Sequence, residues 1–439
     1  MKLILLAVSL MFILTACGGR YENAEQTGDQ SEHYEEVCYE EVCYGEVLFS
    51  GRTRQEYLED LDFLYNALVE NFPFFGVIYR SLGVDMHSYF QQTREIIETT
   101  ENIWSDASFA NIIGAQFLNR AGGLGHLNIL DNTSLRFHVE VFNDDFHNGE
   151  GIFVNFLAEL DNPATRALHG LTDEDFTAPA TGGQSLMRLA YSHNIETEIL
   201  EAGRIAYVNI RSMSGATMHL DEETLLEFFH EVADYEHLII DIRQNGGGDS
   251  RFFPGLVVAP NISEPLKWEH YLFLMGGQHN NHILTPWLGT LGEGYFQRVN
   301  DEVIERLPEL MPDDLHLLEY YFLSQSTVYP SSQSPIFGGK IWLLVSEWVF
   351  SASEQAAHMA KQTGFATLVG QTTGGDGLGF QPIVLALPHT GIVVRYSSAY
   401  GVDNLGRNNQ EFGTEPCVFN MPGKDALQTV LYLIDIERG

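Results

Sequence analysis

Three junctions in this sequence combine small residues with side chains suited to acyl-transfer chemistry. The first is the glycine turn at 245–248, which follows the apolar run 237–242. Glycines after a strand allow backbone N–H groups to approach a ligand closely, as an oxyanion hole requires. The same residues are also typical of an ordinary tight turn, so this motif alone does not separate the two interpretations.

The second and third junctions supply a hydroxyl and an imidazole. Ser351 lies between the apolar run 341–345 and a helical pattern starting near Ser353, where helix N–H groups would lie beside a nucleophile. The structural alternative is a capping box formed by Ser351 and Glu354. His126 follows the glycine-rich segment 121–125, although a single His among 16 is more often structural than catalytic.

Hydrophobic periodicity predicts the elements that would position these residues. A capping box of Thr53 and Glu56 should begin a helix that ends at 71–73, and further helices are expected at 88–98 and 106–120. Strands at 204–210, 237–242 and 341–345, alternating with helices at 220–233 and 353–362, favour an α/β core. We also expect a strand at 152–157, a loop over 163–183, and helices near 301–310 and 313–323.

The N-terminus predicts export and lipid anchoring. An apolar run at 3–14 is too short to span a bilayer and is typical of a signal peptide. It ends in Leu-Thr-Ala-Cys-Gly, which resembles a bacterial lipobox with Cys17 as the lipidated residue. An ordinary secretory signal is the alternative. The mature chain would then lie on the extracytoplasmic face of the cell membrane, held by its acyl chains.

Composition limits the classes of function. The chain has 439 residues, of which 44% are hydrophobic and 19% charged, as in globular proteins of several domains. Acidic residues outnumber basic ones 60 to 23, which argues against a nucleic-acid partner because phosphate binding relies on Lys and Arg. Cys38 and Cys43 are poorly spaced for zinc, and a disulfide between them stays open.

Taken in order, the motifs resemble those of a known enzyme family. The segments LIIDIRQNGGG, LLV followed by FSASE, and TLVGQTTGGDG resemble the tail-specific, or C-terminal-processing, serine proteases over about 204–416. The resemblance implies a crotonase-like (ClpP/crotonase) α/β spiral core that hydrolyses peptide bonds. It also implies that Ser351 is the nucleophile and that backbone N–H groups of Gly247 and Ala352 hold the oxyanion.

One departure from the family pattern changes the expected mechanism. Relatives with a Ser–Lys dyad carry Lys 25 residues after the nucleophile, and that position is Asp376 here. The resemblance to the tricorn and retinoid-binding-protein branch then implies an upstream His as base, which His126 matches in location. Glu411 matches the branch's downstream Glu, with Glu415 a weaker candidate. We expect Glu411 or Asp376 to orient His126.

These expectations combine into a domain plan and a function. The plan is a signal peptide at 1–17, an acidic flexible tether at 18–52, an N-terminal helical domain at 53–121, a mixed α/β segment without a clear PDZ module at 122–203, and a catalytic core at 204–439. The function is a membrane-anchored serine peptidase acting on peptides or proteins without cofactor or metal. The alternatives are a catalytically inactive lipoprotein that binds peptides or lipophiles on the same fold, and a structural surface protein.

Overall fold

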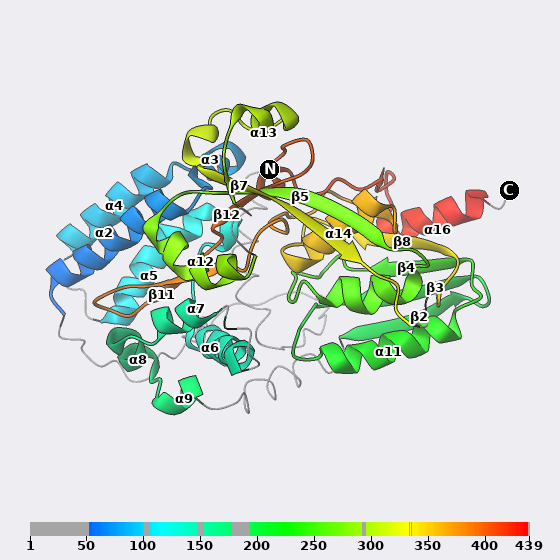
Figure 1. Cartoon of the computed structure of the whole chain (residues 1–439), viewed down its shortest axis with the longest axis horizontal. Helices are drawn as coiled ribbons and strands as arrows, with labels where there is room; N and C mark the ends of the chain where they lie inside the picture. The colour runs from blue at the N-terminus through cyan, green and yellow to red at the C-terminus, as the bar shows by residue number, and fades with distance from the viewer. Residues whose placement is uncertain are drawn as a thin grey trace, which may run out of the picture.

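The computed structural model describes residues 52–100, 105–147, 151, 153–177, 194–291, 296–332, 334 and 336–437. The predictions for Cys17, for Cys38 and Cys43, and for nearly all of the tether lie outside the described residues. The described parts form a mixed α/β fold with a helical region at its N-terminal end (Figure 1).

A six-stranded sheet occupies the right-hand part of the molecule in Figure 1. Its strand order is β13-β9-β8-β4-β3-β2, and only β2 is antiparallel to its neighbour. Helices α11 and α14 pack on one face and α16 on the other, so the central strands are apolar on both sides. The strands are β2 (Ile195–Glu201), β3 (Ile205–Ile210), β4 (His237–Asp241), β8 (Lys340–Val345), β9 (Thr367–Gly370) and β13 (Val418–Phe419), and the helices are α11 (Met218–Glu231), α14 (Ala352–Thr363) and α16 (Ala426–Glu437).

The order of this sheet explains why distant motifs meet. Strands β4, β8 and β9 are parallel neighbours, so the loops after them leave the sheet at one edge. The loop after β4 holds the glycine turn, the loop after β8 holds Ser351, and the loop after β9 holds Asp376. We call these three segments (242–249, 346–351 and 371–377) the strand-end loops.

The N-terminal helices share a hydrophobic core with two smaller sheets. One sheet has the order β1-β11-β10 and the other β12-β5-β7-β6. The helical region at 53–121 therefore packs on later parts of the chain instead of enclosing a core of its own. The strands are β1 (Asn128–Ile129), β5 (Leu266–Leu274), β6 (Gln297–Arg298), β7 (Tyr320–Val328), β10 (Ile383–Ala386), β11 (Val393–Tyr396) and β12 (Ala399–Val402). The helices are α2 (Arg54–Asn71), α3 (Phe75–Leu82), α4 (Met86–Thr99), α5 (Asp106–Gln116), α6 (Asn132–His147), α7 (Val154–Leu160), α8 (Pro163–His169), α9 (Asp173–Thr177), α12 (Gln278–Leu291), α13 (Asp301–Arg306) and α15 (Asn409–Phe412).

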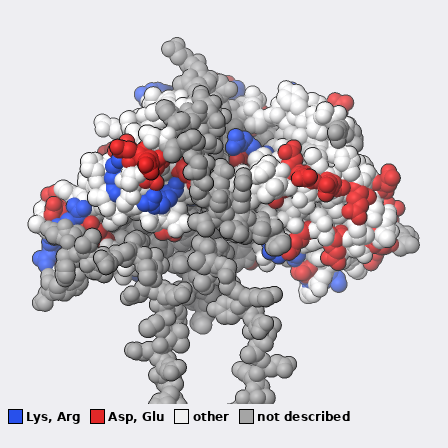
Figure 2. Space-filling model, turned by 90° about the horizontal axis from the view of Figure 1, so that it is seen from below, with Lys and Arg blue, Asp and Glu red and all other residues white. Residues whose placement is uncertain are grey.

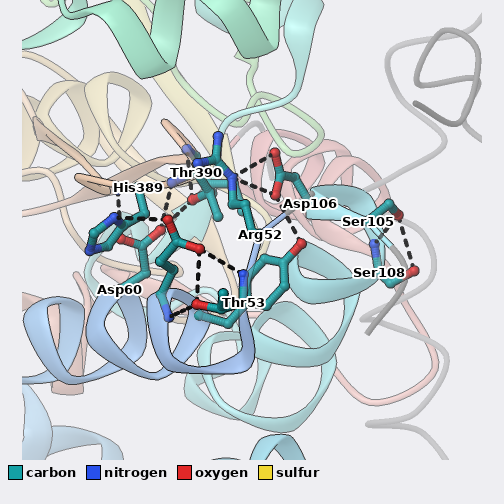
Figure 3. Close-up of polar contacts among 11 residues, drawn as sticks. Arg52, Thr53, Asp60, Ser105, Asp106, Ser108, His389 and Thr390 are labelled. Atoms are coloured by element: carbon teal, nitrogen blue, oxygen red, sulfur yellow. Dashed lines mark hydrogen bonds and ion pairs between the residues drawn. The ribbon is translucent and has the colours of Figure 1, made fainter. Parts of the chain in front are cut away.

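A buried carboxylate fastens α2 to the turn between β10 and β11 (Figure 3). Asp60 is fully buried and accepts hydrogen bonds from the backbone N–H of His389 and of Thr390, both at 2.8 Å. The Thr390 hydroxyl donates a third, at 2.6 Å. Because a buried charge is costly without partners, this arrangement fixes where the first helix docks. The predicted capping box of Thr53 and Glu56 is confirmed at the start of the same helix.

Three local predictions are wrong. The segment predicted as a strand at 152–157 contains helix α7, in which Phe156, Leu157 and Leu160 are buried at helical spacing. The expected loop at 163–183 contains α8 and α9, because Pro163 occupies the first turn of a helix capped by Asn162. The helix expected near 313–323 is a short turn followed by β7, which pairs with β5 from a distant part of the sequence.

The surface carries the acidic excess of the sequence. Figure 2 shows Asp and Glu side chains spread over the right-hand part of the face it draws, the side on which α11 and β2 lie in Figure 1. Exposed acidic residues of these two elements include Glu222, Glu223 and Glu227 of α11 and Glu196 and Glu198 of β2. In the described part of the chain, no helix is both long enough and apolar enough to cross a membrane.

Candidate active site

Ser351 lies at the point where the strand-end loop after β8 turns into α14. Its side chain makes no capping hydrogen bond to the helix. The carboxylate of Glu354 accepts instead from Asn409 Nδ2 at 2.7 Å and from Thr414 Oγ1 at 2.6 Å. The structural alternative, a capping box, is therefore not formed, and the Ser351 hydroxyl is left out of the helix start.

Backbone strain singles out the same residues that the motifs did. Within the described residues, the non-glycine residues with positive φ are His126 (51°), Ser351 (57°) and Asp376 (57°). Such conformations cost on the order of 1–3 kcal/mol each and persist where the surroundings over-determine them, which is common at functional sites. Three residues far apart in sequence thus share one unusual property in one place.

His126 and Asp376 are in direct contact. Nδ1 of His126 lies 2.6 Å from Oδ2 of Asp376, and the two side chains are only 10% and 5% exposed. Ser397 completes the group, because its hydroxyl lies 3.0 Å from His126 Nδ1 and 3.1 Å from Asp376 Oδ2. A carboxylate on Nδ1 favours the tautomer that carries a proton there, which leaves Nε2 as a proton acceptor.

The loops that carry Ser351 and Asp376 are joined through their backbones. The N–H of Ser351 donates to the carbonyl of Gly375 at 3.1 Å, and the N–H of Gly374 donates to Val349 at 2.7 Å. The N–H of Gly377 donates to Asn409 Oδ1 at 2.9 Å. Asp376 is therefore held at a fixed position relative to the nucleophile loop by hydrogen bonds on both of its sides.

The glycine turn contacts the nucleophile loop, but one predicted donor is engaged elsewhere. A Cβ on Gly247 would lie 2.9 Å from Ala352 N and 2.9 Å from Ser351 Cβ, so only glycine fits. The N–H of Gly247 donates to Asn245 Oδ1 at 2.9 Å, so an oxyanion held by this N–H would compete with the Asn245 side chain for it. Ala352 is the first residue of α14, where N–H groups have no partner inside the helix.

Buried hydrogen bonds hold the segment that presents His126, residues 122–130, which we call the His126 arm. The N–H of Gly125 donates to Gln410 Oε1 at 2.9 Å, and its carbonyl accepts from the N–H of Ser397 at 2.7 Å. The φ of Gly125 is +64°, and a Cβ there would lie 2.5 Å from the ring of Phe72. The arm is thus fitted between the helical region and the strand β11.

Glu411, the other carboxylate predicted as a partner of His126, forms an ion pair with a different residue. Both of its oxygens accept from Arg80 of α3, at 2.7 to 3.1 Å, and Asp314 shares the same guanidinium. These contacts raise the pKa of Arg80, because the guanidinium donates to two carboxylates. The sequence motif alone could not separate Glu411 from its neighbour Gln410, which contacts the His126 arm.

His126 packs against the residue that precedes Ser351. The ring of His126 lies 4.8 Å, centroid to centroid, from the ring of Phe350, the residue before Ser351. Among the described residues, no hydrogen bond joins the Ser351 hydroxyl to His126. Catalytic hydrogen bonds can form only when substrate binds, so the missing bond does not exclude His126 as the base.

Sequence reasoning missed several residues that support these groups. Ser353 is fully buried, and its hydroxyl donates to the carbonyl of Asn245, linking the glycine turn to α14. Ser397 and Gln410 were also missed, because nothing in their local sequence marks them. The described residues contain no group of three or more His, Cys, Asp or Glu side chains arranged to hold a metal ion.

Comparison with known proteins identifies the part of the chain that carries the strand-end loops. The profile of peptidase family S41 matches residues 204–418. A search of curated proteins gave no match. Among solved structures, mature CPAF is 14% identical over 83% of this chain and 92% of its own, with a TM-score of 0.52. A candidate peptidase from Parabacteroides merdae ATCC 43184 is 17% identical over 88% of this chain and 97% of its own, with a TM-score of 0.51.

The two similar structures agree with the family match, but they support a narrower conclusion than the family profile does. At such low identity, the two structures show that the fold is shared and do not transfer residue roles. The profile match covers the glycine turn, Ser351 and Asp376, whereas His126 lies before it. Residues 204–418 of this chain therefore form a peptidase family S41 domain.

Proposed function

We propose that the chain is a serine peptidase in which Ser351, His126 and Asp376 act as a triad on a crotonase-like core. The contact between His126 Nδ1 and Asp376 Oδ2 at 2.6 Å carries this proposal. Asp376 occupies the position of the family's Lys, and through this contact it orients His126, which can replace that Lys as the base. The alternative of an inactive binding protein is not favoured, because a binding site has no need of a strained serine beside a carboxylate–imidazole pair.

The reaction follows from the positions of these groups. Ser351 Oγ attacks the carbonyl carbon of the peptide bond while His126 Nε2 takes the hydroxyl proton. Asp376 accepts the Nδ1 proton in a hydrogen bond and stabilises the imidazolium. The proton then passes to the leaving amine as the C–N bond breaks, leaving an ester on Ser351. A water molecule, deprotonated by His126, releases the acid product.

The developing oxyanion needs donors that are already in place. The backbone N–H of Ala352 is one, at the positive end of α14. Gly247 lies close enough to be the second if its N–H leaves Asn245 Oδ1 or shares its hydrogen between Asn245 and the substrate. One such donor typically contributes about 3–4 kcal/mol to transition-state stabilisation.

The peptidase is further proposed to be anchored to the extracytoplasmic face of a membrane through lipidated Cys17. The support is the apolar run at 3–14 followed by the lipobox-like segment. Radiolabelled palmitate should enter the wild-type chain and not Cys17→Ala. Equal labelling of both would contradict the anchor and leave the peptidase proposal untouched.

The peptidase proposal is tested by incubating the full chain with a mixed-sequence peptide library and reading cleavage by mass spectrometry. We expect cleavage by the wild type and none by Ser351→Ala at the same concentration. Ser353→Ala is not a suitable control, because that hydroxyl is buried in the hydrogen bonds of the glycine turn. Equal cleavage by the wild type and Ser351→Ala would identify a contaminant and contradict the proposal.

A further inference from the structure

We infer that Phe350 is a positioning residue, whose ring holds the imidazole of His126 in the orientation that a base for Ser351 needs. This inference rests on the proposed function and adds to it a residue outside the triad. Phe350 is half-buried and lies in the strand-end loop after β8, directly before Ser351. The chain itself therefore places Phe350 next to the nucleophile.

The first observation is that the backbone of Phe350 is held on both sides. Its N–H donates to Ser353 Oγ, and its carbonyl accepts from the Ser353 N–H, both at 3.2 Å. A parallel bridge joins Phe350 to Gly375, whose carbonyl accepts from the Ser351 N–H at 3.1 Å. Since Ser353 is fully buried, the backbone that carries the Phe350 ring cannot shift without breaking buried hydrogen bonds of the nucleophile loop.

The second observation is that the Phe350 ring contacts two distant parts of the chain. Its centroid lies 4.8 Å from that of the His126 ring, with the two planes tilted by 44°. Its Cδ2 lies 3.6 Å from the position that a Cβ on Gly374 would take, two residues before Asp376. The ring thus packs on the imidazole and lies beside the loop that holds Asp376.

The hydrogen bonds of His126 hold its ring at one atom. Nδ1 lies 2.6 Å from Asp376 Oδ2 and 3.0 Å from the Ser397 hydroxyl, so both contacts are made by the same nitrogen. A pivot at one atom leaves the tilt of the imidazole free, because the χ2 torsion of histidine has broad wells. A contact with the rest of the ring removes this freedom, and Phe350 supplies one.

The tilt of the imidazole decides where its second nitrogen points. While Nδ1 stays on Asp376, a change of tilt carries Nε2 toward or away from the Ser351 hydroxyl. Proton transfer needs these two atoms within hydrogen-bond distance, and small misplacements of catalytic groups lower rates strongly. The Phe350 ring also lies beside the imidazole when it becomes positively charged, and an aromatic ring attracts a cation within about 6 Å. Loss of the ring should therefore slow the chemical step.

The test measures kcat and KM on one peptide that the wild type cleaves. We expect Phe350→Ala to lower kcat by at least about tenfold while KM stays close to the wild-type value. Phe350→Leu keeps much of the apolar volume without a flat ring and should lose less. Phe350→Tyr keeps the ring and should retain most of the activity. A raised KM with unchanged kcat would assign Phe350 to substrate binding and overturn the inference.

A double variant shows whether Phe350 acts through His126. The rate at which a fluorophosphonate probe modifies Ser351 is measured with and without each substitution. In the His126→Ala background, Phe350→Ala should cause no further loss, because no imidazole is left to position. The same loss in both backgrounds would show that Phe350 supports the Ser351 turn directly and would overturn the inference.

Phe365→Ala is the matched control for a general loss of packing. Phe365 is also half-buried and lies just beyond the other end of α14, where its ring packs on Phe253 at 6.1 Å. The variant should lower the melting temperature and leave kcat unchanged. Equal losses of kcat in Phe365→Ala and Phe350→Ala would overturn the inference. If Phe350→Ala fails to fold, Phe350→Leu decides, and wild-type kcat in that variant overturns it.

The failure of the proposed function can be told apart from the failure of this inference. If the wild type cleaves no peptide and reacts with no probe, the proposed function fails. NMR spectra of isotope-labelled histidine then decide, with the His126 signal assigned from its absence in His126→Ala. That signal should broaden or split in Phe350→Ala and stay single in Phe350→Tyr and Phe365→Ala. A single sharp signal in Phe350→Ala would show that the imidazole is held without Phe350 and would overturn the inference.

Discussion

The nucleophile and the base of the candidate site are held by two differently built regions. The strand-end loops leave neighbouring parallel strands of one sheet, and their positions relative to one another follow from that sheet and a few backbone hydrogen bonds. The His126 arm belongs to another core, which the N-terminal helices share with β10 and β11. Ser351 and Asp376 are therefore positioned locally, whereas His126 depends on how two halves of the chain dock.

Because the two regions are built differently, substitutions in them should impair activity in two different ways. A change in the strand-end loops alters the reactive group itself. A change in the His126 arm leaves Ser351 in its strained turn but removes its proton acceptor. The contacts that couple the regions include His126 with Asp376, Gly125 with Gln410, and Arg80 with Glu411. Substitutions can test each of them.

The largest expected effect comes from removing the two reactive groups. Ser351→Ala and His126→Ala should each lower kcat/KM on peptides by more than about 10³-fold, and the double variant should be no worse than either. The reason is that the hydroxyl and its base act as one unit. Additive losses in the double variant would show that the two regions do not work together.

Asp376→Asn should have the next largest effect, a loss of roughly 10²–10⁴-fold in kcat. An amide beside Nδ1 cannot stabilise the imidazolium and favours the wrong tautomer. Glu411→Gln is the matched control, because Glu411 pairs with Arg80 and not with His126. A larger loss in Glu411→Gln than in Asp376→Asn would reverse this assignment of the two carboxylates.

Gly125→Ala should displace the His126 arm while leaving the strand-end loops in place. The added Cβ would lie 2.5 Å from Phe72, and we expect kcat to fall at least about tenfold, since small misplacements of catalytic groups are costly. Gly123→Ala provides the comparison. Its φ of +83° gives similar backbone strain, but no atom lies within 4 Å of the new Cβ. Equal activity losses in both variants would point to backbone strain instead of displacement.

The smallest effect concerns the stability of the sheet region in acid. His358 on α14 is half-buried with its Nε2 atom buried and without a partner, and desolvation lowers its pKa to about 4. The unfolded chain then binds the proton more readily, so stability should fall as pH drops from about 6.5 to 4, by on the order of 3 kcal/mol. Chemical denaturation of His358→Gln should show a shallower decrease with falling pH, whereas exposed His219→Gln should follow the wild type. An unchanged slope in His358→Gln would contradict an imidazole that the fold keeps neutral.

The two regions also differ in what their sequence could predict. The strand-end loops follow apolar strands and carry short motifs, so local sequence indicated Ser351, the glycine turn and Asp376. The contact between His126 and Asp376 depends on pairing across 250 positions, and only the choice between Asp376 and Glu411 could be stated in advance. Ser397 and Gln410 have no local signal at all, because each acts through a tertiary contact.

The prediction of secondary structure failed where contacts with distant parts of the chain decide between a helix and a strand. The short apolar run near 153–157 suits a strand or a buried helix, and packing made it α7. Strand β7 was missed because its partner β5 lies more than 40 residues earlier in sequence. The engagement of Gly247 N–H by Asn245 Oδ1 likewise depends on a side-chain orientation that no sequence pattern encodes.

The central claim is that His126, from one region, activates Ser351, from the other. The most direct test is the second-order rate at which a fluorophosphonate probe modifies Ser351, with the labelled residue confirmed by peptide mapping. The account predicts labelling of the wild type at Ser351 and a rate lower by at least about 10³-fold in His126→Ala, with melting temperatures unchanged. Equal rates in the wild type and His126→Ala would contradict it, because Ser351 would then be activated without His126.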